Sequence, residues 1–448
     1  MKKLKLVDNI SGLQAVQLLR FTTFFIISVV FTKSHLTRAE IGQWEMFLFI
    51  SSLLSFFWVS GIIQSLLTLY NRNRTFRSLG DVNARKSPEI YNSFLLLVFF
   101  SLLIFALGMP VNYVFPTSGM IRAVPYSNLL FWYILLSNPV AIIEYIYLLN
   151  NRSHRILQYG IYTYVAQIFL VLVPVIMGKD LLWAVYGLFI ITFARWIWLI
   201  TLLRRYTIME FSWDYIREQL RIGAPLIITF LISGSSQYVD GLIIRAKYSD
   251  PGVFAMYRYG AKEFPLTLLL ANGLSNALLP HFSTREGMKD ALATLKKRSR
   301  KLINILFPAT MVTMFFARWL YPRMFTPEYI RSADVFLIYL LLVIPRLIFP
   351  QTIVIGRKKT HITLIAAIIE IAINVPLSLL LIKPYGVAGV AIATFFVYSL
   401  EKLFLMGYVW AKMKIKPTQY IPLARYLIFS VLTAMLFVMI DHRWIDFH

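Results

Sequence analysis

The polar positions of this sequence separate a series of long apolar blocks. About thirteen such blocks occur, each near the roughly 20 residues that a helix needs to cross about 30 Å of hydrocarbon. Helices are expected, because backbone amides in lipid must be paired within the segment. The alternating segments of about ten residues that build a membrane barrel are absent from the sequence. The predicted spans are 13–31, 44–70, 90–109, 127–149, 157–178, 181–203, 222–244, 252–280, 302–321, 333–355, 361–382, 386–410 and 421–440.

Lysine and arginine concentrate in alternate loops between these blocks. Of the 45 basic residues, 27 lie in the N-terminal segment and every second loop, whereas the intervening loops hold 11. Cytoplasmic loops are enriched in these residues, which predicts a cytoplasmic N-terminus. Thirteen spans place the C-terminus outside, and twelve or fourteen return it to the cytoplasm, so the span count stays open.

The chain also contains a faint internal repeat. The segment Gly42–Leu67 resembles Gly252–Pro280, and Lys179–Gly187 resembles Lys383–Ala391, in the same order along the chain. Matches that recur in order at similar offsets indicate a duplicated unit. Six spans separate the copies, so both begin on the same side of the membrane. Parallel repeats of this kind are related by an axis along the membrane normal and are typical of transporters.

We therefore predict an all-α integral membrane protein with about 12–14 transmembrane helices. Two six-helix lobes related by pseudo-two-fold symmetry cover residues 1–203 and 223–411. A cytoplasmic linker with an amphipathic helix joins them over 204–222. Residues 412–448 add a basic loop, a further C-terminal span and an outer tail.

Composition excludes several other classes of protein. The 448 residues are 58% hydrophobic and 15% charged, far from the composition of a disordered or soluble chain. There is no cysteine for a disulfide, a thiolate nucleophile or a thiolate metal site. Most of the net charge of +24 comes from the Lys- and Arg-rich loops that indicate membrane orientation, so no nucleic-acid partner is expected. No phosphate-binding loop, nucleophile elbow or metal spacing of histidines appears, so we predict no enzyme activity, no metal and no bound cofactor.

Several segments resemble the polysaccharide flippases, of the O-antigen (Wzx) type, in the MOP (MATE-like) transporter superfamily. They are Gln17–Gly61, Trp213–Pro225, Tyr238–Ile244, Gly252–Tyr257 and Tyr385–Thr394. The resemblance implies a monomer in the bacterial inner membrane that exports undecaprenyl-pyrophosphate-linked oligosaccharide units for lipopolysaccharide. It also implies alternating access driven by a proton or sodium gradient, as in an antiporter, and at most a loose association with a polysaccharide polymerase.

Cations inside the spans are the candidate ligands of the pyrophosphate. Charge at bilayer depth is costly and usually faces a cavity or a partner. Arg258 and Lys262 are four residues apart, one turn along the same helical face, and Arg20 lies in the first span. Arginine binds phosphate oxygens through paired hydrogen bonds. Arg195 and Arg346 are further candidates, and internal salt bridges are the alternative for each residue.

Three carboxylates inside the spans are candidates for binding the coupling ion: Glu144, Asp240 and Glu370. A carboxylate in apolar surroundings can load and release a proton near neutral pH, because burial disfavours its charged form. Two other functions stay open. One is a cation-coupled multidrug exporter, or an exporter of another lipid-linked precursor, in the same superfamily. The other is a membrane polymerase or ligase, which the short loops disfavour.

Overall fold

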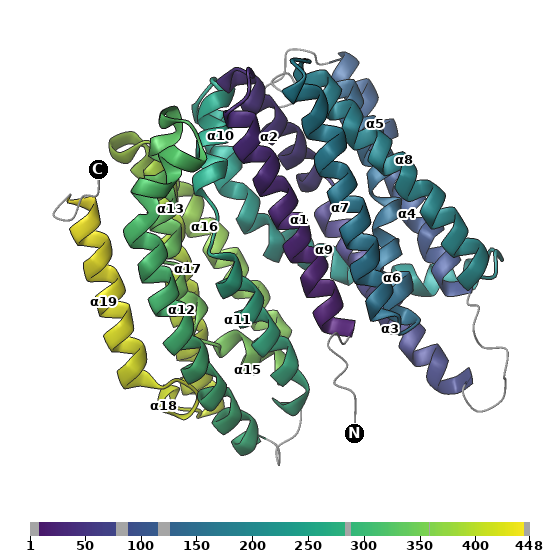
Figure 1. Ribbon diagram of the computed structural model, residues 1–448. Coiled ribbons are helices and arrows are strands. Elements are labelled where there is room, and N and C mark those ends of the chain that lie inside the picture. Colours follow the sequence, from purple (N-terminus) through teal and green to yellow (C-terminus); the bar gives the residue numbers. More distant parts are fainter. Residues whose placement is uncertain (1–8, 78–87, 115–125, 283–287, 358, 443–448) are drawn as a thin grey trace, which may run out of the picture. The chain divides into compact units, whose positions relative to one another are not determined.

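The computed structural model describes residues 9–77, 88–114, 126–282, 288–357 and 359–442. Within these ranges the chain is helical and contains no strand (Figure 1). It divides into two compact units, residues 1–234 and residues 235–448. The all-α class and the two-lobe organisation are therefore confirmed. The predicted outer tail, residues 443–448, lies outside the described residues.

The N-terminal unit is a bundle in which α1 packs along α7 and α7 along α8, while α4 packs against α3 and α5. Its elements are α1 (Asn9–Thr32), α2 (Arg38–Leu53), α3 (Phe56–Arg77), α4 (Pro88–Val114), α5 (Ser127–Ser137), the 3-10 helix η1 (Pro139–Ala141), α6 (Ile142–Leu149), α7 (Ser153–Ile176), α8 (Leu181–Tyr206) and the first part of α9 (Trp213–Lys247). Val16, Trp58, Ile142 and Leu199 belong to its apolar core.

The C-terminal unit pairs α16 with α17 and packs α12 against α13 and α19. Its elements are the rest of α9, α10 (Pro251–Gly260), α11 (Pro265–Leu278), η2 (Leu279–Phe282), α12 (Met288–Met324), η3 (Pro327–Tyr329), α13 (Ile330–Leu340), α14 (Val343–Arg346), α15 (Pro350–Gly356), α16 (Thr360–Tyr385), α17 (Val387–Met413), α18 (Pro417–Tyr420) and α19 (Leu423–Asp441). Phe282, Phe307, Leu347 and Leu405 belong to its largest core cluster.

Membrane-length helices recur through the described residues. Ten are long and apolar enough to span a bilayer, and up to twelve are counted when each bent helix pair is one span. The upper count of twelve equals the lower end of the predicted 12–14 transmembrane helices. The helix α19, at the place of the predicted additional C-terminal span, is one of these candidates by length and composition. The predicted linker, 204–222, holds the end of α8 and the beginning of α9, and the predicted lobe bounds stay predictions.

The spans predicted as single helices at 44–70 and 252–280 are both broken. The first bends by 43° between α2 and α3, and Trp58 Nε1 donates to the carbonyl of Leu54 at the break, at 2.8 Å. The second is interrupted between Gly260 and Pro265, where α10 ends and α11 begins. Non-helical backbone at membrane depth requires such partners or burial in protein. The two breaks occur in the segments that resemble each other in sequence.

Close helix pairing recurs in the other repeated segments. Gly187 on α8 lies against the backbone of α7, and Gly389 on α17 lies against that of α16. A Cβ atom at these positions would collide with the carbonyl oxygen of Leu170 or of Leu381, respectively. Small residues let helices approach in this way. The small-residue stretch of α17 therefore has a packing role, as its composition suggested.

Candidate functional site

Arg20 connects three helices of the N-terminal unit. From α1 its Nη2 donates a 2.8 Å hydrogen bond to Glu144 Oε1 on α6, and its Nε donates to the Tyr164 hydroxyl on α7 at 2.6 Å. The Glu144 side chain is 11% exposed, whereas that of Arg20 is 49% exposed. One predicted ion-coupling residue is thus the salt-bridge partner of a predicted pyrophosphate ligand. About half of the Arg20 side chain is exposed, and its Nε and Nη2 are engaged by Tyr164 and Glu144.

Arg195 joins the same cluster from α8. Its Nη2 donates to Gln167 Oε1 at 2.9 Å. The guanidinium carbons of Arg20 and Arg195 lie 5.8 and 5.2 Å from the centre of the Tyr164 ring, within cation–π range. Both arginines therefore contact one tyrosine, and Glu144 pairs with Arg20. Within this cluster two guanidinium groups face one carboxylate.

Asp240 on α9 is the most densely hydrogen-bonded carboxylate of the C-terminal unit. It is 4% exposed. Tyr257 and Tyr339 each donate a hydroxyl hydrogen bond to Oδ2 at 3.1 Å, Asn374 Nδ2 donates to Oδ1 at 3.2 Å, and Thr394 donates to Oδ2. These side chains come from α10, α13, α16 and α17. These three hydroxyl donors and one amide donor form the Asp240 cage and offset the cost of burying a carboxylate.

Arg346 is held by Glu263, a partner that the sequence did not reveal. Its Nε donates to Glu263 Oε2 at 3.0 Å, and Nη2 bonds the other oxygen. Glu263 lies in the break between α10 and α11, and Arg346 is the last residue of α14 before a second break. The bidentate pair thus ties two breaks together within the unit. Arg346 also lies 4.7 Å from the centre of the Tyr398 ring, and Lys402 lies 4.5 Å from it.

Arg258 and Lys262 do not form the helical stripe that their spacing suggested. The helix α10 ends at Gly260, so Lys262 lies beyond it and the two residues share no helical face. Glycine is a poor helix residue, and the position before Pro265 is pushed away from helical angles. Lys262 Nζ instead lies 5.3 Å from the centre of the Tyr259 ring.

The last predicted ion-coupling residue, Glu370, lies on α16 and lines a cavity with Glu401 of α17. A side-chain hydrogen bond joins Glu370 to Ser236 of α9. Glu401 forms a 2.6 Å ion pair with the adjacent Lys402, as expected of neighbours in sequence. Of the predicted carboxylates, Asp240 and Glu370 thus belong to the C-terminal unit and Glu144 to the N-terminal one.

Comparison with known families decides the affiliation. A family model described as lipid II flippase MurJ matches residues 90–446. The chain belongs to the MurJ lipid II flippase family. Families of this kind are transporters of the MOP superfamily and not enzymes. A search of curated protein sequences found no match.

Solved structures agree on the fold of this MurJ-family chain. A lipid II flippase MurJ in an inward closed conformation aligns with a TM-score of 0.68 at 17% identity, covering 96% of this chain and 93% of that one. An inward-facing MATE multidrug resistance transporter aligns at 0.62 and 14% identity, covering 88% and 93%. The eukaryotic MATE transporter AtDTX14 aligns at 0.61 and 14% identity, covering 95% and 97%. The family model confirms the superfamily predicted from the sequence, but not its O-antigen branch.

Residues that sequence reasoning missed are the neutral partners of the charges. Tyr164 and Gln167 recur on one face of α7, yet nothing in an aromatic-rich span distinguishes them from lipid-facing residues. Thr394 closes the segment Tyr385–Thr394 that carried the family resemblance, and Asn374 is a polar residue in an apolar block. Neither signal linked these residues to Asp240, and Tyr339 had no signal of its own.

Proposed function

We propose that this chain is an ion-coupled flippase for polyprenyl-pyrophosphate-linked saccharides in the bacterial inner membrane, with a cytoplasmic N-terminus. The observation that carries the proposal is the pair Arg20 and Arg195 around Tyr164. A pyrophosphate bears roughly two negative charges, and guanidinium groups bind its oxygens through paired hydrogen bonds. The surplus cation in the N-terminal unit matches that anion.

A multidrug exporter is the weaker alternative, although the MATE neighbours share the fold. The cargo cavity of a cationic-drug exporter needs accessible carboxylates. Here Glu144 is 11% exposed at its side chain and paired, while its partner Arg20 is 49% exposed. Electrostatic complementarity therefore favours an anionic cargo in the N-terminal unit.

Two saccharides share the pyrophosphate chemistry. The family name points to lipid II, and the sequence resemblance points to an oligosaccharide repeat unit of a surface polysaccharide such as O-antigen. Both hang from a polyprenyl chain through a pyrophosphate, which the same arginines would neutralise. We propose the oligosaccharide unit as the cargo, because the segments Trp213–Pro225 and Tyr385–Thr394 resemble polysaccharide flippases.

Coupling is proposed to use Asp240. Hard cations prefer oxygen ligands, and the carboxylate of Asp240 and the hydroxyl oxygens of Tyr257, Tyr339 and Thr394 converge there. A proton or sodium ion bound at Asp240 would neutralise the negative charge of the buried carboxylate. The packing of α9, α16 and α17 around it would change as a result. Glu144 is the poorer site, since Arg20 already neutralises it.

Deleting the gene in its native cell and restoring it from a plasmid tests the function. Accumulation of the lipid-linked repeat unit on the inner leaflet, reversed by the plasmid, is the expected result. Accumulation of lipid II instead would keep the flippase and overturn the oligosaccharide cargo. Normal levels and leaflet distribution of both lipids would overturn the proposed function.

A further inference from the structure

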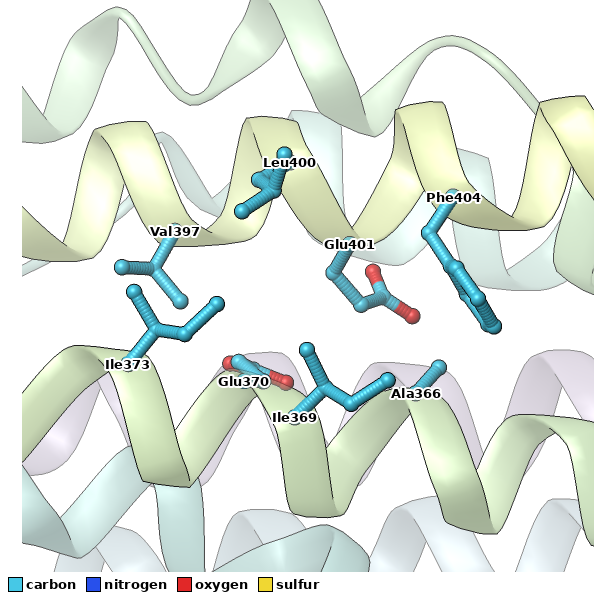
Figure 2. A pocket seen from close by; sticks show the side chains of 8 residues that line it. All are labelled: Ala366, Ile369, Glu370, Ile373, Val397, Leu400, Glu401 and Phe404. Atoms are coloured by element: carbon cyan, nitrogen blue, oxygen red, sulfur yellow. The ribbon is translucent and has the colours of Figure 1, made fainter.

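A cavity of about 180 Å³ lies between α16 and α17 in the C-terminal unit. Figure 2 shows Glu370 of α16 and Glu401 of α17 in the space between the two helices, surrounded by six apolar side chains. The relative exposure of Glu401 is 8%. Two carboxylates thus border one apolar space from facing helices.

The cations nearby are too few for these carboxylates. Lys402 forms the 2.6 Å ion pair with Glu401 Oε2, and its Nζ also donates to Gln351 at 3.1 Å. Arg346 is already engaged by Glu263. Around Glu370, the charged groups that face it from the packed elements are Glu401 and Lys402 of α17 and Asp240 of α9. Asp240 is held by its own donors, so among these described groups the two carboxylates that line the cavity share one ammonium.

Two like charges that border one apolar cavity are costly, since each raises the energy of ionising the other. Lys402 favours ionised Glu401, because the two are in direct contact. Glu370 has a hydroxyl neighbour, Ser236, in place of a cation. Of the two carboxyl groups, Glu370 is therefore the one that more readily holds a proton.

We propose that Glu370 is a proton-binding residue that forms, with Glu401 and Lys402, a second ion site of the C-terminal unit, separate from the Asp240 cage. A proton is the fitting ligand because most of the cavity wall is apolar. A hard metal cation would take about six oxygen ligands. The proton site stands on this geometry, whereas its use in transport rests on the proposed function.

A hydrophobic carbodiimide tests the site without any transport. N,N′-dicyclohexylcarbodiimide adds to protonated carboxyls in apolar surroundings and leaves a stable N-acylurea that peptide mass spectrometry locates. In the purified full chain we expect an adduct at Glu370 at about pH 6 that decreases at least severalfold towards about pH 9, as the carboxyl ionises. Asp214, an exposed carboxylate at the start of α9, is the reference that stays unlabelled.

Variants sharpen the assignment. Glu401→Gln removes the like charge, so labelling of Glu370 should need a lower pH than in the wild type. Asp240→Asn should retain the adduct at Glu370 and shift its pH dependence less than Glu401→Gln does, because Asp240 does not line the cavity. No adduct at Glu370 at any pH, a yield that neither pH nor Glu401→Gln alters, or loss of the adduct in Asp240→Asn would each overturn the proposal.

Transport assays distinguish a failure of the proton-site proposal from a failure of the proposed function. Glu370→Gln is expected to lower the acceleration of flipping by a proton gradient at least severalfold while binding of cargo is kept. A labelled Glu370 in a chain that flips no lipid-linked saccharide would refute the proposed function alone. A chain that flips with undiminished proton dependence after Glu370→Gln would refute the role of this site alone.

Discussion

Arg20 and Arg195 lie on opposite sides in sequence of the helix that carries Tyr164, and both guanidinium groups contact that one ring. Glu144 neutralises one of them. The cluster leaves Arg20 half exposed, with hydrogen-bonding capacity for an anion. This arrangement is the physical basis for assigning pyrophosphate recognition to the N-terminal unit.

Replacing either arginine should weaken cargo binding. Arg20→Ala or Arg195→Ala is expected to reduce the apparent affinity for a polyprenyl-pyrophosphate saccharide about tenfold or more, since a charged hydrogen bond contributes roughly 1.5–3 kcal/mol. Binding to purified protein measures the effect. Arg323→Ala is the matched control, because Arg323 caps a backbone carbonyl near the end of α12. Equal affinities for all variants would contradict the assignment.

The variant Glu144→Gln tests whether Glu144 binds the coupling ion or serves only as the salt-bridge partner of Arg20. The substitution removes the negative charge next to Arg20, so affinity for the pyrophosphate cargo should stay equal or rise, while thermal stability falls. Ion dependence of transport should persist. If the ion dependence disappears with affinity intact, Glu144 is a coupling residue and the pairing with Arg20 is secondary.

Asp240→Asn should abolish ion-linked stabilisation. A ligand at about ten times its dissociation constant stabilises the folded state by about 1.4 kcal/mol, so the coupling cation should raise the melting temperature of the wild type. Melting curves of purified protein across sodium concentration and pH measure this. Asp214→Asn, on the same helix but exposed, should respond like the wild type. An unaltered response of Asp240→Asn would exclude this cage as the ion site.

Alanine in place of glycine should destabilise the protein at the two close helix pairs but not at the uncrowded Gly407. Gly187→Ala and Gly389→Ala place a Cβ against a backbone carbonyl, and overpacking of this kind typically costs about 1–3 kcal/mol. At Gly407 nothing lies within 4 Å of an added Cβ, so Gly407→Ala should be neutral or stabilise by up to about 1 kcal/mol through helix propensity. Thermal unfolding in detergent compares the three, and similar melting temperatures would contradict the close pairing.

The sequence predicted the positions of the apolar helices well and the ion pairs between distant side chains poorly. Apolar length predicts a helix wherever backbone amides must be satisfied in lipid, so α1, α8 and α19 lie close to the expected ranges. The break after Gly260 was missed because the flanking residues are apolar enough to continue a span. That break is what separates Lys262 from the helix that carries Arg258.

Ion pairs escaped prediction because their partners are remote in the chain. Arg20 and Glu144 are separated by 124 residues, and Arg346 and Glu263 by 83. Only the packing of α1 near α6 and the meeting of two helix breaks bring them together. The pair of Glu401 and Lys402, in contrast, joins residues that are adjacent in the chain.

Flipping in proteoliposomes tests the central claim most directly. The purified chain is reconstituted with a polyprenyl-pyrophosphate oligosaccharide, and an impermeant enzyme that modifies the sugar reports which leaflet holds it. The account predicts that wild-type protein and Arg323→Ala expose the lumenal pool under an ion gradient, while Arg20→Ala and Arg195→Ala do so at least tenfold more slowly at limiting cargo. Equal rates for wild-type, arginine-variant and protein-free vesicles would contradict it.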